Sequence, residues 1–261
     1  MAHIPKLIML DLDGTLYVGS KPMPGAIAAL EQLRARGVVL RFITNTTTKS
    51  QDELVAQLRV MGFQLDENEL VSAPVATKLA LLRLQQQSGK SLRIWPLVAD
   101  AIKPDFTEFF WDEERPDYIV VGDIGERWNL ALINRIFTIA HAGADIIALH
   151  KGRFWQTAEG LHVDIGFFVA GLEYASSKSA RIMGKPNRDF FQLILDSVGV
   201  AAGDALMVGD DIDSDVGGAQ LMGIKGCLVK TGKFRQSYFD QSAVKPDYVI
   251  DSIAGLNTMI G

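Results

Sequence analysis

The sequence predicts an α/β fold: a Rossmann-like core with a parallel sheet, plus a second α/β domain inserted into it. Apolar runs of strand length alternate with helix-like segments along the chain, which is typical of βα units. The first run, Leu7–Leu10, is apolar throughout, as expected for a strand buried on both faces of a sheet. A polar, turn-rich stretch at 85–91 interrupts this alternation, which then restarts. We therefore place the core domain at residues 1–80 and 180–261 and the inserted domain, or cap, at 81–179.

The elements follow from apolar spacing and from start and stop residues. For example, Ile27, Leu30 and Leu33 repeat at helical spacing and the pattern stops at Gly37. In the first third we expect strands at 7–10 and 38–43, and helices at 26–36, from the capping box Ser50-x-x-Glu53 to Gly62, and at 73–87. In the middle we expect strands at 91–96, 117–121 and 145–149, helices at 131–142 and 167–174, and a linker at 175–178. In the last third we expect helices at 190–198 and 215–222, and strands at 205–208, 226–229 and 248–250.

The composition of the chain argues against nucleic acid and membranes as partners. The net charge of −5 over 261 residues provides no basic surface and argues against nucleic acid as a partner. The single cysteine, Cys227, excludes an internal disulfide, fits a reducing compartment and lies in an apolar stretch typical of a buried thiol. No stretch approaches the ~18 apolar residues of a membrane span, and the N-terminal residues do not resemble a signal peptide. We expect a cytoplasmic protein without a membrane partner.

Polar residues recur where predicted strands end. Asp11-Leu12-Asp13-Gly14-Thr15 follows the first strand, Thr44-Asn45 follows the second, and acids from Asp210 to Asp215 follow the strand at 205–208. A fourth signal is Lys185, just ahead of a helix whose first position is expected to be Pro186. Open α/β sheets bind ligands at the carboxyl ends of their strands, so four parallel, adjacent strands would bring these groups together.

That combination contains what phosphoryl transfer requires. Asp11 is the expected nucleophile, forming an aspartyl-phosphate, and Asp13 is the expected general acid and base. Thr44 and the backbone amides near Leu12 and Asn45 would hold phosphate oxygens, and Lys185 would neutralise charge on them.

The acidic run after the later strand is expected to supply the metal ligand. Asp11 and Asp210 would bind Mg²⁺, which prefers oxygen ligands. We place Asp215 behind the metal ligands, leave Asp211 as either a ligand or a group that positions Lys185, and assign Asp213 to solvent.

These motifs resemble those of the haloacid dehalogenase (HAD) superfamily phosphatases: DxDGT, a strand-end Thr or Ser, a Lys, and GDxxxxD. All are present, as Asp11–Thr15, Thr44, Lys185, and Gly209-Asp210 through Asp215. The resemblance implies the same roles, and adds the backbone carbonyl of Asp13 to the Mg²⁺ ligands. The large insert resembles the class IIA branch, with an α/β cap after the second motif.

Details of the sequence resemble the group of phospholysine phosphohistidine inorganic pyrophosphate phosphatases and their sister hydrolase-domain proteins. Segments that carry this likeness include Gly152-Arg153-Phe154 and Thr231-Gly232-Lys233-Phe234. Relatives act on small phosphorylated metabolites, and such caps often pair, which implies a homodimer through the cap. We expect the cap loop His150–Trp155 either to meet substrate or to form an ordinary surface loop.

Two other functions use the same residue types. A phosphomutase or phosphotransferase would return the phosphoryl group to a metabolite. A phospho-acceptor signalling module would also use clustered acids, Mg²⁺ and an aspartyl-phosphate. The position of the acid pair on the first strand, and the insert that interrupts the core, favour a phosphohydrolase over such a module.

Overall fold

The computed structural model describes residues 4–157 and 160–261, which form two compact units. The first unit comprises the residues up to Thr44, Asp52–Val71 and Lys185–Gly261. The second comprises Asn45–Gln51 and Ser72–Gly184. The expected boundary after residue 80 differs from this division, because the helix that follows Ser72 packs in the hydrophobic core of the second unit.

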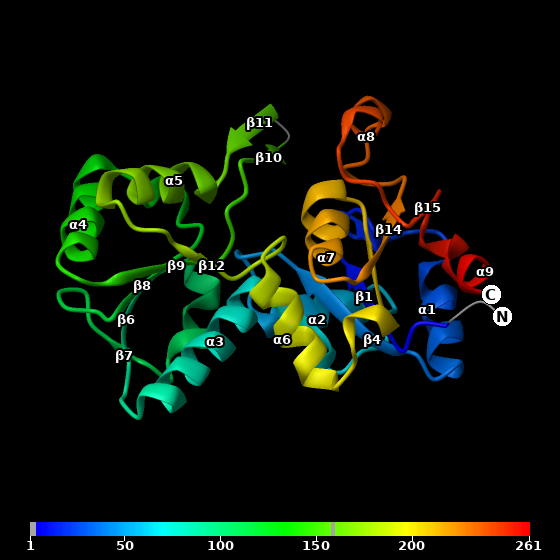
Figure 1. The fold of residues 1–261 in the computed structure, drawn as a ribbon, viewed down its shortest axis with the longest axis horizontal. Coiled ribbons are helices and arrows are strands. Elements are labelled where there is room, and N and C mark those ends of the chain that lie inside the picture. The colour runs from blue at the N-terminus through cyan, green and yellow to red at the C-terminus, as the bar shows by residue number, and fades with distance from the viewer. Residues whose placement is uncertain (1–3, 158–159) are drawn as a thin grey trace. The chain divides into compact units, whose positions relative to one another are not determined.

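A six-stranded sheet forms the centre of the first unit (Figure 1), with the strand order β15-β14-β13-β1-β4-β5. Its strands are β1 (Leu7–Asp11), β4 (Val39–Thr44), β5 (Leu70–Ser72), β13 (Ala205–Gly209), β14 (Lys225–Val229) and β15 (Tyr248–Ile250). β1 pairs in parallel with both β13 and β4. All five residues of β1 are buried, which explains its uninterrupted apolar run. The predicted parallel sheet is confirmed, with β1 at its centre.

Helices and short turns surround this sheet. They are α1 (Ala26–Ala35), α2 (Gln51–Val60), α6 (Arg188–Val198), a π-helical turn at Ile212–Gly217, α7 (Gly218–Gln220), α8 (Gln236–Gln241) and α9 (Leu256–Ile260). A hairpin of β2 (Tyr17–Val18) and β3 (Lys21–Pro22) follows the first strand, and 3₁₀ turns lie at Glu67–Glu69, Ala202–Asp204 and Ile253–Gly255. Leu30 of α1 and Leu54 of α2 join strand residues such as Leu40 in one hydrophobic core.

The second unit contains a five-stranded parallel sheet of its own, with the order β12-β9-β8-β6-β7. Its strands are β6 (Arg93–Leu97), β7 (Phe110–Trp111), β8 (Tyr118–Val121), β9 (Asp145–Ala148) and β12 (Arg181–Ile182). Helices α3 (Ala73–Ser88), α4 (Leu130–His141) and α5 (Ile165–Ser176), a hairpin of β10 (Phe154–Thr157) and β11 (Gly160–Val163), and 3₁₀ turns at Asp100–Phe106 and Gly125–Arg127 complete it.

Residues of the second sheet alternate between two hydrophobic clusters. Ile94 of β6 packs in the cluster that contains Leu81 of α3, whereas its neighbour Trp95 packs in the cluster with Ile136 of α4 and Leu172 of α5. Helices therefore cover both faces of a parallel sheet, as the βα pattern predicts. The expected linker at 175–178 is wrong at its start, because α5 continues to Ser176.

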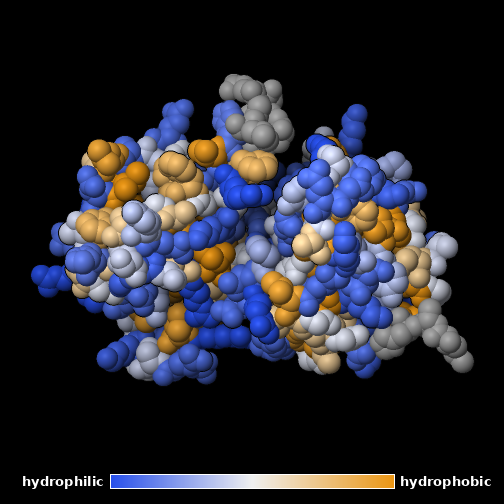
Figure 2. Space-filling model, turned by 45° about the horizontal axis from the view of Figure 1, so that its top comes forward, coloured by the Kyte–Doolittle hydropathy of each residue, from blue (hydrophilic) through white to orange (hydrophobic). Residues whose placement is uncertain are grey.

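The described residues contain no helix that is both long and apolar enough to cross a membrane. The face in Figure 2 is largely hydrophilic, with hydrophobic residues in separate groups. Cys227 is a free thiol on β14 that is fully buried, as its apolar neighbourhood predicts.

Candidate active site

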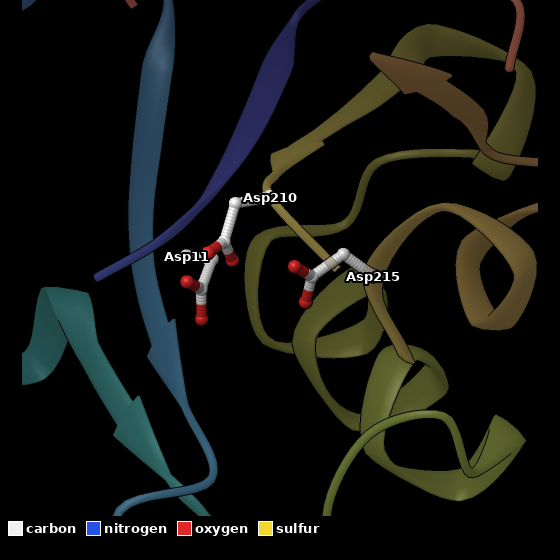
Figure 3. A group of neighbouring side chains, drawn as sticks. All are labelled: Asp11, Asp210 and Asp215. Carbon is white, nitrogen blue, oxygen red and sulfur yellow. The ribbon is translucent and has the colours of Figure 1, made fainter. Parts of the chain in front are cut away.

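Three carboxylates meet at the carboxyl edge of the first sheet (Figure 3). Asp11 is the last residue of β1, Asp210 directly follows the neighbouring strand β13, and Asp215 lies in the π-helical turn after it. Each contributes an oxygen, and these oxygens all lie within 4.8 Å of one another. The parallel pairing of β1 with β13 brings Asp11 and Asp210 together from opposite ends of the sequence.

Lys185 lies against this cluster. Its Nζ is 2.5 Å from Asp11 Oδ1 and 2.6 Å from Asp215 Oδ1, and the residue is only 4 % exposed. Burial alone would lower the pKa of the ammonium, but the charges of Asp11 and Asp215 outweigh burial and raise that pKa above its usual range. The charged form of the buried Lys185 ammonium is therefore favoured.

One lysine does not balance this many acids. Burial, together with the charges of Asp11 and Asp215, raises the pKa of Asp210 to about 8. Burial also raises the pKa of Asp215 to about 7, although Lys185 works in the opposite direction. Buried carboxylates with surplus negative charge are stable only with a proton or another cation. A cluster of hard oxygen ligands with unbalanced negative charge fits a divalent cation such as Mg²⁺.

The turn after β1 brings its backbone close to Asp210. Gly14 has φ +87°, and a Cβ added there would lie 2.1 Å from Asp210 Oδ2. A side chain at this position would thus require both an unfavourable backbone conformation and a displaced carboxylate. The Oγ1 of buried Thr15 lies 3.5 Å from Asp11 Oδ2. This geometry accounts for the Gly-Thr that follows the acid pair.

The other expected site residues divide between the two units. Leu12 is buried, with its carbonyl oxygen accepting from Leu16 N, whereas the side chain of Asp13 is exposed on the same loop. Thr44 is buried at the end of β4, one residue beyond the partner of Asp11 in the β1–β4 register. Asn45 belongs to the second unit, where its side-chain oxygen packs against Gly184.

The side chain of Asp211 contacts the turn after β13 and Lys233. Its side chain accepts hydrogen bonds from the backbone of Asp213 and Ser214, so it caps the π-helical turn. It also pairs with Lys233 at 3.2 Å. Lys185 contacts Asp215, the residue expected to stand behind the metal ligands, and Asp215 belongs to the same carboxylate cluster as Asp210. Asp213 is exposed, as expected.

The expectation that all four signals follow adjacent core strands is wrong for Lys185. The strand before it, β12, pairs with β9 in the sheet of the second unit. Pro186 is also outside α6, because Asn187 is the N-cap and its side chain accepts from Asp189 N. The polar residues after β1, β4 and β13 therefore follow strands of the first sheet. Lys185 instead begins the last chain segment of the first unit, directly after the second unit ends at Gly184.

Sequence reasoning gave no role to Thr231, Gly232 and Lys233, although it noted them as part of a resemblance. They follow β14, the strand next to β13, and Lys233 N donates to Asp210 Oδ2 at 2.7 Å. The available signal was their position: a polar, glycine-containing turn directly after an apolar strand run. The cap loop lies in the second unit, where His150 Nδ1 accepts from Gly152 N. The side chain of Trp155 is outside the described part of the chain.

Comparison with known proteins identifies the family. A family model described as haloacid dehalogenase-like hydrolase matches residues 8–109, and one described as HAD-hydrolase-like matches residues 182–256. Haloacid dehalogenase-like hydrolase domain-containing protein 2 of Homo sapiens is 38 % identical over 241 residues, which cover 92 % of this chain and 89 % of that protein. The chain belongs to the haloacid dehalogenase-like hydrolase family. Its fold class and its enzyme class, a HAD-type phosphatase, are as the sequence predicts.

Further comparisons agree with this family. The phospholysine phosphohistidine inorganic pyrophosphate phosphatase of Homo sapiens is 36 % identical over 253 residues, covering 95 % of this chain and 91 % of that protein. The solved 4-nitrophenylphosphatase of Thermotoga maritima has a TM-score of 0.89 at 26 % identity, covering 98 % of both chains. The glycerol phosphate phosphatase of Mycobacterium tuberculosis, solved with magnesium, has a TM-score of 0.81 at 26 % identity, covering 97 % of this chain and 76 % of that one.

Proposed function

We propose that this protein is a Mg²⁺-dependent phosphohydrolase that cleaves a small soluble phosphorylated substrate through an aspartyl-phosphate on Asp11. The observation that carries the proposal is the position of Asp11, clustered with Asp210 and Asp215 and 2.5 Å from Lys185. A carboxylate held beside the Lys185 ammonium at a strand end suits attack on phosphorus, since nearby positive charge lowers repulsion between two anions.

Asp13 is the proposed general acid and base. It lies two residues beyond Asp11 on the same loop, and its side chain is exposed, so it can exchange protons with solvent. Asp13 would protonate the leaving oxygen in the first step, in which Asp11 becomes phosphorylated. It would then take a proton from the water that hydrolyses the aspartyl-phosphate.

Substrate phosphate would be held by groups around the same edge. Thr44 ends the strand next to β1, and the backbone amides near Leu12 and Asn45 are further donors. Lys185 would stabilise the charge that spreads over the phosphoryl oxygens in the transition state.

Asp11, Asp210 and the backbone carbonyl of Asp13 are the proposed Mg²⁺ ligands, and Asp215 and Asp211 are placed behind them. Bound Mg²⁺ would supply positive charge that offsets repulsion between the nucleophile and the substrate phosphate. The clustered carboxylates of Asp11 and Asp210 support a divalent cation at this position, and one solved relative contains magnesium.

The proposed substrate class is a small phosphorylated metabolite. Relatives of this chain are named for 4-nitrophenyl phosphate, for glycerol phosphate and for phospholysine, phosphohistidine and pyrophosphate. A phosphomutase or a phospho-acceptor module fits less well, because the relatives with these names are phosphatases. We also propose a cytoplasmic location, which the low cysteine content, with Cys227 alone, supports, and a homodimer formed through the second unit.

Release of inorganic phosphate tests the proposal. We expect turnover of phosphomonoesters, pyrophosphate or phosphoramidates that depends on Mg²⁺ and stops with a chelator. Asp11→Asn should lose activity by about 10³-fold or more, because the amide cannot form the aspartyl-phosphate, while its circular dichroism stays native. Asp189→Asn, at the start of α6 and outside the carboxyl cluster, is the matched control and should retain activity. Turnover that persists in Asp11→Asn would contradict the nucleophile assignment.

A further inference from the structure

The loop Thr231–Lys233 lies against both acidic motifs of the site, and no step of the proposed reaction uses it. It follows β14, whose neighbour β13 leads into Asp210. Lys233 N donates a 2.7 Å hydrogen bond to Asp210 Oδ2. Because this donor belongs to the backbone, it is present with any residue except proline at position 233.

Two glycines enclose the same carboxylate oxygen. A Cβ built on Gly232 would lie 2.0 Å from Asp210 Oδ2, and one built on Gly14 would lie 2.1 Å from it. The Cβ of Gly232 would also lie 2.5 Å from Gly14 Cα, so the two turns pack backbone against backbone. Gly232 has φ +54°, a conformation that also favours glycine. The carboxylate of Asp210 therefore rests in a space that exists only without side chains at both positions.

Thr231 links the loop to the turn that carries Asp13. Its Oγ1 donates to the carbonyl oxygen of Gly14. The loop thus contacts Asp210 on one side and the Asp13–Gly14 turn on the other. The ammonium of Lys233 is separate from both contacts, because it pairs with Asp211 and its side chain is 72 % exposed.

We propose that Thr231–Lys233 is a positioning element that orients the Asp210 carboxylate and holds the Asp13–Gly14 turn, and thereby sets the affinity of the site for Mg²⁺. This inference rests on the proposed function of the same site. Groups that orient a metal ligand commonly change metal affinity by about 10- to 100-fold when they are altered. The effect should therefore appear in cation binding itself, before any turnover.

Gly232→Ala is the first test, read by calorimetric titration with Mg²⁺ alone. We expect the dissociation constant to rise by about tenfold or more, because the added methyl group displaces Asp210 Oδ2. Gly199→Ala is the matched control, since Gly199 has φ +65° but nothing within 4 Å of an added Cβ. It carries the same backbone strain and should leave Mg²⁺ affinity unchanged. Native affinity in Gly232→Ala would overturn the proposal.

Thr231→Val is the second test, and it remains available if Gly232→Ala does not fold. It removes one hydroxyl at nearly constant volume and should lower kcat more than it raises KM, because the Asp13–Gly14 turn loses an anchor. Thr107→Val is the control, because Thr107 makes a comparable hydrogen bond to Pro104 O on the surface of the second unit. Equal kinetics in Thr231→Val and wild type would refute the role of Thr231.

A third variant separates backbone from side chain. Lys233→Met keeps the N–H that reaches Asp210 and removes the ammonium, so Mg²⁺ affinity should not fall; a tenfold loss would contradict the assignment to the backbone. Wild-type protein that binds Mg²⁺ without releasing phosphate would refute the proposed function and leave this inference standing. If the wild-type protein releases phosphate and Gly232→Ala keeps native Mg²⁺ affinity, the proposed function stands and this inference is refuted.

Discussion

Lys185 determines the charge balance of the carboxyl cluster. It is the buried cation that contacts both Asp11 and Asp215. A buried ion pair that loses one partner leaves the other charge uncompensated, which costs far more than the loss of a surface pair. The same residue is therefore expected to matter for stability and for the proposed chemistry.

Lys185→Met should lower the free energy of unfolding by about 3 kcal/mol in metal-free protein, because two buried carboxylates lose their cation. Urea unfolding in the presence of a chelator measures this. Lys6→Met is the control: Lys6 pairs with Asp204 on the surface, where such pairs contribute about 0–1 kcal/mol. A stability equal to wild type for Lys185→Met would show that the cluster does not depend on this cation.

Helix α1 is joined to the turn before β5 by an ion pair. Arg34 Nη1 and Nη2 each donate to a carboxylate oxygen of Glu69 at 2.7 Å. Burial works to raise the pKa of Glu69, but the hydrogen bonds and charge of Arg34 outweigh it, so that pKa lies below its usual value of 4.5. The folded protein therefore binds this proton less readily than the unfolded chain does.

The sign of the resulting pH dependence follows from linkage. A carboxyl group with a lowered pKa in the folded state contributes stability above its unfolded pKa, and that contribution is lost as the pH falls. Glu69→Gln should lower the urea midpoint near pH 7 and have progressively less effect below pH 4.5. The control is Glu31→Gln, on the exposed face of α1. A Glu69→Gln effect that is independent of pH would argue against this ion pair.

Strands and helices were largely predictable from sequence because their residues follow the periods of buried strands and amphipathic helices. β1, β4 and β13 are where apolar runs place them, and the residues at their ends lie at one edge of the sheet. Short strands such as β2, β3 and β7 were not predicted, because two residues are too few to show an alternation of apolar and polar side chains.

Contacts between residues that are distant in the sequence were harder to predict than helices and strands. No local signal in the sequence shows that Lys185 follows a strand of the other sheet, or that Lys233 N reaches Asp210. Both depend on which strands become adjacent, and chain order alone does not determine that order. The roles proposed for the motif residues followed from the chemistry of their side chains. The contacts of the loop Thr231–Lys233 with Asp210 and Gly14 are visible only in the structure.

The second unit exposes apolar side chains on two neighbouring helices. Leu130 of α4 and both Phe167 and Tyr174 of α5 are well exposed, and these helices pack on each other. Exposed apolar patches of this kind often mark protein interfaces. This surface supports the proposed homodimer.

Light scattering should report twice the mass of one chain, and Phe167→Asp should shift the protein to a monomer because a charge would be buried in the interface. Val60→Asp, at an exposed apolar position on α2 of the first unit, is the control and should remain dimeric. A wild-type protein with the mass of a single chain would end the dimer proposal.

The path of the chain through its two units has a consequence for biosynthesis. The ribosome makes β1 before its partner β13, because the whole Ser72–Gly184 segment lies between these two strands in the chain. That segment is continuous and can fold while the nascent apolar strand β1 still lacks one neighbour. A chain released before β13 is made would thus leave one edge of β1 unpaired, and open strand edges are prone to aggregation.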